Sequence, residues 1–123
     1  QTAGTLRLLI VEDHADTASL LKNLLERSGH TVQTAGDVAS ALALAERETF
    51  DLLISDVGLP DASGYALMRE VATRHKLRGV AMSGYGMDED VRKSLEAGFS
   101  AHLVKPVDIT TLEQTIQRLA FGK

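Results

Sequence analysis

Polar side chains that could carry out chemistry stand at the ends of short apolar segments. Glu12 and Asp13 follow one such segment, and others end on Asp56, Ser83 and Lys105. If these segments are parallel strands, their carboxyl ends share one edge of a sheet, where the functional crevices of such sheets lie. Three carboxylates, a hydroxyl and an ammonium group would then meet in one cleft.

A cleft that holds three carboxylates requires a cation. Two like charges about 4 Å apart repel by about 1 kcal/mol in bulk water and by about 4 kcal/mol at an effective dielectric constant of 20. Oxygen ligands suit Mg²⁺, a hard ion that keeps several waters and accepts phosphate as a further ligand. The chain has no cysteine, and its four histidines lack the spacing of zinc ligands. We therefore predict a magnesium site formed by Glu12, Asp13 and Asp56.

This set of groups favours phosphoryl transfer to an aspartate. The Asp56 carboxylate would attack in line, while Mg²⁺ and Lys105 offset charge on the equatorial oxygens. Ser83 would hydrogen-bond the new acyl phosphate, which adds about −1.5 to −2 charge. A polar loop or a helix cap is the simpler interpretation of each residue alone. For all of them together, that interpretation needs several coincidences.

Five pairs of strand and helix must position these residues. Short apolar segments predict strands over 6–12, 31–35, 51–56, 78–83 and 101–105. Apolar residues at helical spacing predict helices that end at Gly29, cover 38–48, begin near Gly64, cover 88–97 and run through Ile109–Leu119. Asp37 and Asp108 stand just ahead of helices, as N-caps do. The alternation predicts an α/β fold with one doubly wound, five-stranded parallel sheet and five helices.

Composition is typical of a single globular domain. The chain has 123 residues, of which 44% are hydrophobic and 24% charged. Residues 1–5 (QTAGT) resemble a linker remnant, which predicts a domain over 6–121. The net charge of −4 and the scattered basic residues argue against nucleic-acid binding. The apolar runs are too short to cross a bilayer, so we expect a cytoplasmic domain without membrane contact, although the parent protein could be membrane-anchored.

Four segments, in this order and spacing, resemble the receiver domains of two-component response regulators over nearly the whole chain. They are LLIVEDH (8–14), LLISDVGLPDASGY (52–65), AMSGYG (81–86) and HLVKPVD (102–108). The resemblance implies a flavodoxin-like sheet with strand order 2-1-3-4-5. It also implies that Asp56 accepts phosphate from a histidine kinase or a histidine phosphotransfer domain, and that the fourth helix, fifth strand and fifth helix form the face that responds.

The resemblance assigns a role to each matching position. Asp13 would bind Mg²⁺ directly, Glu12 would contribute through water, and the carbonyl of Gly58 would complete the protein ligands. Ser83 would be the switch hydroxyl. Lys105 would bind the phosphoryl group.

Some positions in the matching segments carry further expectations. The peptide bond between Lys105 and Pro106 is expected to be cis. Glu12 stands where the family often has Asp, and His102 stands at the position of the switch aromatic, commonly Tyr or Phe. His102 is either that switch or a half-exposed histidine indifferent to the site. Tyr85, on a loop beside the site, either affects the lifetime of the phosphoryl group or only covers it.

The SGYG and AHLVKPVD segments are most similar to receivers attached to hybrid sensor histidine kinases. Two alternatives remain. A degenerate receiver would serve only as a protein-binding module, but such a chain should have lost an acid or the lysine. A phosphohydrolase with an aspartate nucleophile would place a second acid two residues after Asp56, where this chain has Gly58. A dinucleotide-binding domain is disfavoured, since no glycine lies between the first strand and its helix.

Overall fold

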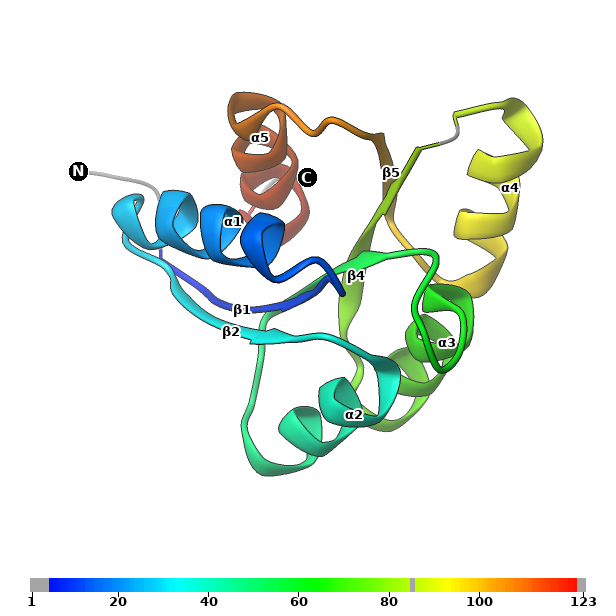
Figure 1. The fold of residues 1–123 in the computed structure, drawn as a ribbon, viewed down its shortest axis with the longest axis horizontal. Coiled ribbons are helices and arrows are strands. Elements are labelled where there is room, and N and C mark those ends of the chain that lie inside the picture. The colour runs from blue at the N-terminus through cyan, green and yellow to red at the C-terminus, as the bar shows by residue number, and fades with distance from the viewer. Residues whose placement is uncertain (1–4, 85, 122–123) are drawn as a thin grey trace.

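The computed structural model describes residues 5–84 and 86–121. Within them, a helix follows each strand of one parallel sheet, whose order is β2-β1-β3-β4-β5 (Figure 1). The strands are β1 (Arg7–Val11), β2 (Thr31–Ala35), β3 (Leu52–Asp56), β4 (Arg78–Ser83) and β5 (Ala101–Val104). The helices are α1 (Ala15–Arg27), α2 (Val38–Arg47), α3 (Gly64–His75), α4 (Asp88–Ala97) and α5 (Ile109–Phe121). The fold class and the strand order predicted from the sequence are confirmed.

The predicted element bounds agree with the observed ones to within two residues. β1 begins at Arg7 rather than residue 6, because the N–H of Leu6 donates to Nδ1 of His30 instead of to a strand. α2 ends at Arg47, since Glu48 adopts an extended conformation, with φ −132° and ψ 153°. Thr5 is exposed and residues 1–4 lie outside the described part of the chain, so the proposed domain start at residue 6 stays a prediction.

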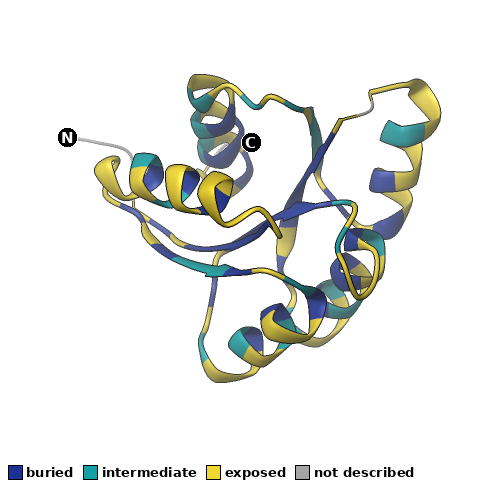
Figure 2. Cartoon of the chain, viewed as in Figure 1, coloured by how far each residue is buried: buried dark blue, intermediate teal, exposed yellow. Residues whose placement is uncertain are grey.

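Alternate residues along the strands build two separate cores, one on each face of the sheet. Leu8 and Ile10 pack with apolar residues of α1 and α5, whereas Leu9 and Val11 pack with those of α2, α3 and α4. Figure 2 shows that β1, β3 and β4 are largely buried, whereas the edge strands β2 and β5 are more exposed. Burial on both faces explains why the sequences of β1, β3 and β4 are rich in apolar residues.

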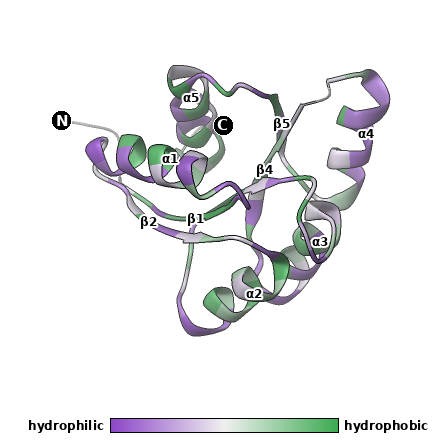
Figure 3. Cartoon of the chain, viewed as in Figure 1, coloured by the Kyte–Doolittle hydropathy of each residue, from purple (hydrophilic) through white to green (hydrophobic). Residues whose placement is uncertain are grey.

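The central strand β3 is buried at all five positions. Its neighbours are β1 and β4, and the register places Val11 opposite Ser55 and Asp56 opposite Met82. One further step along β1 brings Glu12 beside Asp56. In Figure 3 the chain becomes hydrophilic just beyond the end of β1, where the functional residues were predicted.

Two predicted helix caps are present. Asp37 accepts a hydrogen bond from the N–H of Ser40 at 2.7 Å, at the start of α2. Asp108 accepts one from the N–H of Thr111 at 2.9 Å, at the start of α5. Among the described residues, no helix is long and apolar enough to cross a membrane.

Candidate functional site

Lys105 connects two of the predicted acidic residues at the carboxyl edge of the sheet. Its Nζ atom lies 2.9 Å from Oε1 of Glu12 and 2.9 Å from Oδ2 of Asp56. The Glu12 side chain is fully buried and that of Asp56 is 11% exposed. These three groups were predicted to meet, although 93 residues separate Lys105 from Glu12. The doubly wound topology brings them together.

The two buried carboxyl groups differ in acidity. Burial favours the protonated form of both, but hydrogen bonds from Lys105 and His14 outweigh it at Glu12, so that the pKa of Glu12 is lowered. At Asp56, burial is the largest influence and the negative charges of Glu12 and Asp13 add to it. Lys105 opposes them only in part, and the pKa of Asp56 is raised.

Lys105 is protonated more firmly than an ordinary lysine. Its burial would lower the pKa, but its hydrogen bonds to Asp56 and Glu12 and their charges outweigh that effect and raise the pKa. Lys105 is therefore a permanent cation at working pH, held between two carboxylates. A positive charge placed in this way can meet the oxygens of a transferring phosphoryl group.

Four side chains could offer ligands to one metal ion. Ligand atoms of Glu12, Asp13, His14 and Asp56 all lie within 4.8 Å of one another. The three acids were predicted, and His14 was not, because the histidines were judged only by zinc-type spacing along the chain. Its position directly after Glu12 and Asp13 was the available signal.

His14 is bound to the acidic cluster and exposed to solvent. Nδ1 lies 2.9 Å from Oε2 of Glu12 and 3.4 Å from Oδ1 of Asp13, while 73% of the side chain is exposed. The hydrogen bond to Glu12 is the main reason why the pKa of His14 is raised. A protonated imidazole donates hydrogen bonds and cannot ligate a metal. The carboxylates, rather than the imidazole of His14, are therefore the ligands suited to Mg²⁺.

The loop between β3 and α3 folds back closely on Asp56. The N–H of Gly64 donates to the carbonyl of Val57 at 2.6 Å, and Gly58 pairs with Ser63 in an antiparallel bridge. A Cβ atom on Gly64 would lie 2.2 Å from the carbonyl oxygen of Asp56, so only glycine fits there. Nothing lies within 4 Å of a Cβ built on Gly58. The close approach of the backbone of Asp56 and Val57 is thus sufficient to explain Gly64.

Asp61 at the tip of this loop was missed by the sequence analysis. Its two carboxylate oxygens accept hydrogen bonds from the N–H groups of Val38 and Ala39 at 2.9 and 3.0 Å. These two bonds are the main cause of a lowered pKa at Asp61. A cap supplied from more than 20 residues away leaves no signal in local sequence.

The fourth and fifth strands place the remaining predicted residues. Ser83 is buried at the end of β4, and its carbonyl accepts a hydrogen bond from the N–H of Lys105 at 2.7 Å. The peptide bond between Lys105 and Pro106 is cis, as the resemblance implied. Tyr85 lies outside the described residues, so its predicted effect is untested.

His102 is half-buried on β5 and contacts α4. Its Nδ1 and the Oγ of Ser94 share a hydrogen bond of 2.7 Å. Leu103 lies on the other face of the sheet, in the core formed with α1 and α5. His102 thus has a specific partner on the helix that precedes its strand, and its role as a switch stays a prediction.

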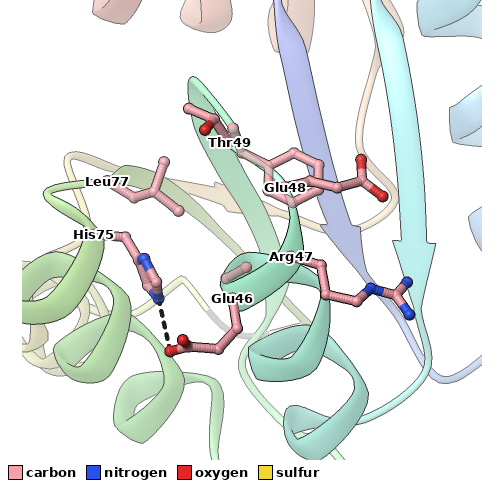
Figure 4. Close-up of a pocket in the computed structure, with 8 residues that line it drawn as sticks. Glu46, Arg47, Glu48, Thr49, His75 and Leu77 are labelled. Atoms are coloured by element: carbon pink, nitrogen blue, oxygen red, sulfur yellow. Dashed lines mark ion pairs between the residues drawn. The ribbon is translucent and has the colours of Figure 1, made fainter.

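Two hollows in the surface differ in their relation to these residues. A groove of about 460 Å³ between α1 and the segment after β5 is lined by Glu12, Leu20, Lys105 and Pro106 among others. A second hollow, of about 290 Å³, lies at the opposite end of the sheet, where Glu46 pairs with His75 at 3.4 Å (Figure 4). The second is lined by none of the predicted site residues, whereas Glu12 and Lys105 line the groove.

The comparisons with known proteins agree with this arrangement. The sequence profile of the response regulator receiver domain matches residues 8–117. An uncharacterized 14.6 kDa protein in the sodA1 3′ region of Leptolyngbya boryana is 38% identical, over 98% of this chain and 96% of that protein. The response regulator protein PilR of Pseudomonas aeruginosa is 37% identical, over 89% of this chain but 25% of PilR.

Two further comparisons concern the type of protein and the fold. The sensor histidine kinase RcsC of Salmonella typhimurium is 31% identical, over 89% of this chain and 12% of RcsC. The crystal structure of a CheY-like receiver domain protein from Methanospirillum hungatei superimposes with a TM-score of 0.88 at 31% identity, over 95% of this chain and 94% of that one. The profile match and these relatives show that the chain belongs to the receiver domain family of two-component response regulators.

Proposed function

We propose that this domain accepts a phosphoryl group on Asp56 in a Mg²⁺-dependent phosphorelay. The donor would be the phosphohistidine of a histidine kinase or of a histidine phosphotransfer domain. One observation carries the proposal: the ammonium group of Lys105 lies 2.9 Å from the carboxylates of both Glu12 and Asp56, in the cleft at the carboxyl edge of the sheet. This arrangement provides a nucleophile, a fixed cation and an acidic environment for a metal.

The transfer requires only one bond exchange. The Asp56 carboxylate attacks the phosphorus atom in line, an O–P bond forms, and the P–N bond to the donor imidazole breaks with its electron pair returning to the ring nitrogen. Lys105 is already hydrogen-bonded to Asp56, so it can offset the charge of the arriving group without a large movement. The domain thus acts on its own aspartate rather than on a separate substrate.

The residues present fit a magnesium ion. Glu12, Asp13 and Asp56 offer carboxylate oxygens within 4.8 Å of one another, and the Gly58 carbonyl would complete the protein ligands. Burial is the main cause of the raised pKa of Asp56, and the negative charges of Glu12 and Asp13 add to it. A cation would relieve the repulsion among these carboxylates. When bound, Mg²⁺ would offset charge on the phosphoryl oxygens.

Phosphorylation would change the face formed by α4, β5 and α5. Ser83 and Lys105 are joined through the backbone, and His102 is joined to α4 through Ser94. Leu95 and Val104 expose apolar surface on this face, at 52% and 48%. We propose Ser83 as the switch hydroxyl and His102 as the switch ring. The parent protein could be a hybrid histidine kinase, a proposal that the similarity to RcsC supports.

Labelling of the purified domain tests the proposal. Wild type should take up ³²P from acetyl phosphate in the presence of Mg²⁺ and lose it slowly. Asp56→Asn keeps the shape but removes the nucleophile, so uptake should fall to background. Asp51→Asn, just before the first residue of the same strand, is the matched control and should be labelled as wild type.

The same experiment distinguishes the alternatives. Uptake by Asp56→Asn at the wild-type rate would place the phosphoacceptor elsewhere. A module that only binds proteins would take up no label in any variant. A phosphohydrolase would release phosphate in repeated rapid turnover without retaining label on the protein.

A further inference from the structure

Asp61 joins the loop after β3 to the start of α2. Its Oδ1 accepts the N–H of Val38 at 2.9 Å, and its Oδ2 accepts the N–H of Ala39 at 3.0 Å. The first N–H groups of a helix have no partner within the helix, so a carboxylate binds them well. In Figure 1 the loop between β3 and α3 descends beside the start of α2.

The base of this loop lies next to Asp56. The antiparallel bridge between Gly58 and Ser63 and the hydrogen bond from Gly64 to Val57 close the loop across its base. Asp61 is therefore the tip of a short closed loop, and Gly58 belongs to its base. A closed loop transmits displacement, so movement of the tip would shift Gly58 relative to Asp56.

The start of α2 also has a cap of its own. Asp37 accepts the N–H of Ser40 at 2.7 Å, which is the ordinary local cap. The Ala39 amide could be solvated by water if Asp61 were absent, because Ala39 is exposed, whereas Val38 is buried. The two bonds from Asp61 therefore add to the local cap, and their distinctive effect is to tie the loop to the helix.

We propose that Asp61 is a positioning residue, which holds the Gly58 carbonyl at the metal and phosphoryl site by tying the loop to α2. The inference rests on the proposed function. Asp61 would touch neither the metal nor a reacting atom, and it acts through three residues of closed loop. The lowered pKa of Asp61 supports the tie, since it keeps the carboxylate ionised.

A pair of substitutions at the start of α2 tests the role. Asp61→Ala removes the tie, whereas Asp37→Ala removes a hydrogen bond from the same helix terminus without touching the loop. Mg²⁺ alone is titrated into each folded protein, with backbone amide shifts as the readout. We expect Asp61→Ala to weaken Mg²⁺ binding about tenfold, as loss of outer-shell support commonly does. Asp37→Ala should leave the affinity within about twofold of wild type.

A second variant and a second measurement make the test decisive. Asp61→Asn keeps one acceptor oxygen, so its Mg²⁺ affinity should lie between those of wild type and Asp61→Ala, and it replaces Asp61→Ala if that variant fails to fold. Hydrogen exchange at Val38 and Ala39 reports whether the tie is broken. Faster exchange with wild-type Mg²⁺ affinity would overturn the positioning role, as would equal losses of affinity in the Asp61 and Asp37 variants.

Failure of the proposed function would look different. A wild-type domain that binds no Mg²⁺ and takes up no label from acetyl phosphate would overturn that function and the role of Asp61 with it. The other outcome is that wild type binds Mg²⁺ and is labelled, and that Asp61→Ala does both equally well. That result would overturn only the role of Asp61.

Discussion

At the scale of the residue, the site is an arrangement of charges in which one cation serves two anions. Lys105 bonds to both Glu12 and Asp56, but the two acids respond in opposite directions. The pKa of Glu12 is lowered and the pKa of Asp56 is raised, even though burial favours the protonated form of each. Asp56 is thus the acid whose charge is least compensated, and the one whose charge a bound cation would offset most.

The opposite shifts predict opposite effects of removing each charge from the metal-free protein. The raised pKa of Asp56 means that its ionised carboxylate destabilises the folded state. This destabilisation decreases as the pH falls through the raised pKa, and it is absent below the ordinary value of 3.8. Asp56→Asn should therefore be more stable than wild type at pH 7, with the difference shrinking toward pH 4. Urea unfolding in EDTA measures the free energies.

Glu12→Gln is the matched control for that measurement. The lowered pKa of Glu12 means that its charge stabilises the fold above the ordinary value of 4.5, and that this contribution is lost as pH falls through the lower, folded value. Glu12→Gln should be less stable than wild type at pH 7. Equal destabilisation by both substitutions would show that the bond from Lys105 to Asp56 outweighs the repulsion.

At the scale of the element, the loop between β3 and α3 controls how closely the helix approaches the candidate nucleophile. Gly64 begins α3 where a Cβ atom would lie 2.2 Å from the carbonyl oxygen of Asp56 and 3.0 Å from the Cα of Val57. The obstacle is backbone, which cannot turn away as a side chain can. The turn that positions Asp56 is therefore specified by a packing constraint.

Gly64→Ala should destabilise the domain by about 1–3 kcal/mol, the usual range for overpacking. Gly58→Ala is the control, because no atom lies within 4 Å of its added Cβ, and its stability should stay within about 0.5 kcal/mol of wild type. Thermal and urea unfolding of the two variants measure their stabilities relative to wild type. Comparable stability of the two variants would mean that the loop relaxes without loss.

The contact between β5 and α4 gives a second prediction at this scale. Ser94 is fully buried and its hydroxyl is the partner of His102 Nδ1, so Ser94→Ala should lower the free energy of unfolding by about 0.5–1.5 kcal/mol. If His102 is a switch, its ring resonances should also shift when acetyl phosphate and Mg²⁺ are added to wild type. Ring resonances that ignore phosphorylation would leave His102 as a packing residue only.

The sequence predicted the elements well and the contacts between them less well. Short apolar segments and helical spacing predicted all five strand–helix pairs. Because the carboxyl ends of parallel strands share one edge, Glu12, Asp56 and Lys105 were also predicted to lie together there. Asp61 could not be found in this way, because its partners belong to the start of α2, more than 20 residues away. His14 was overlooked because a ligand pattern along the chain does not describe a cluster built across strand ends.

At the scale of the whole molecule, the residues that stabilise the fold and the residues of the candidate site occupy different regions. Two apolar cores hold the sheet from both faces, and they account for most of the buried side chains. The acidic residues lie beyond these cores, at one edge of the sheet, and the apolar side chains of the cores cannot offset their negative charge. The stability of the whole domain should therefore depend on what binds at that edge.

This dependence can be measured with Mg²⁺. A ligand that binds only the folded state stabilises it by about 2.7 kcal/mol at a concentration of 100 times its Kd. For a domain of 123 residues this corresponds to a rise in melting temperature of roughly 10 °C. Asp13→Ala removes one proposed ligand while leaving the bonds of Lys105 to Glu12 and Asp56 in place, so its melting temperature should rise much less at the same Mg²⁺ concentration. Scanning calorimetry of both proteins over a Mg²⁺ series provides the comparison, and equal rises in the two proteins would place the metal away from Asp13.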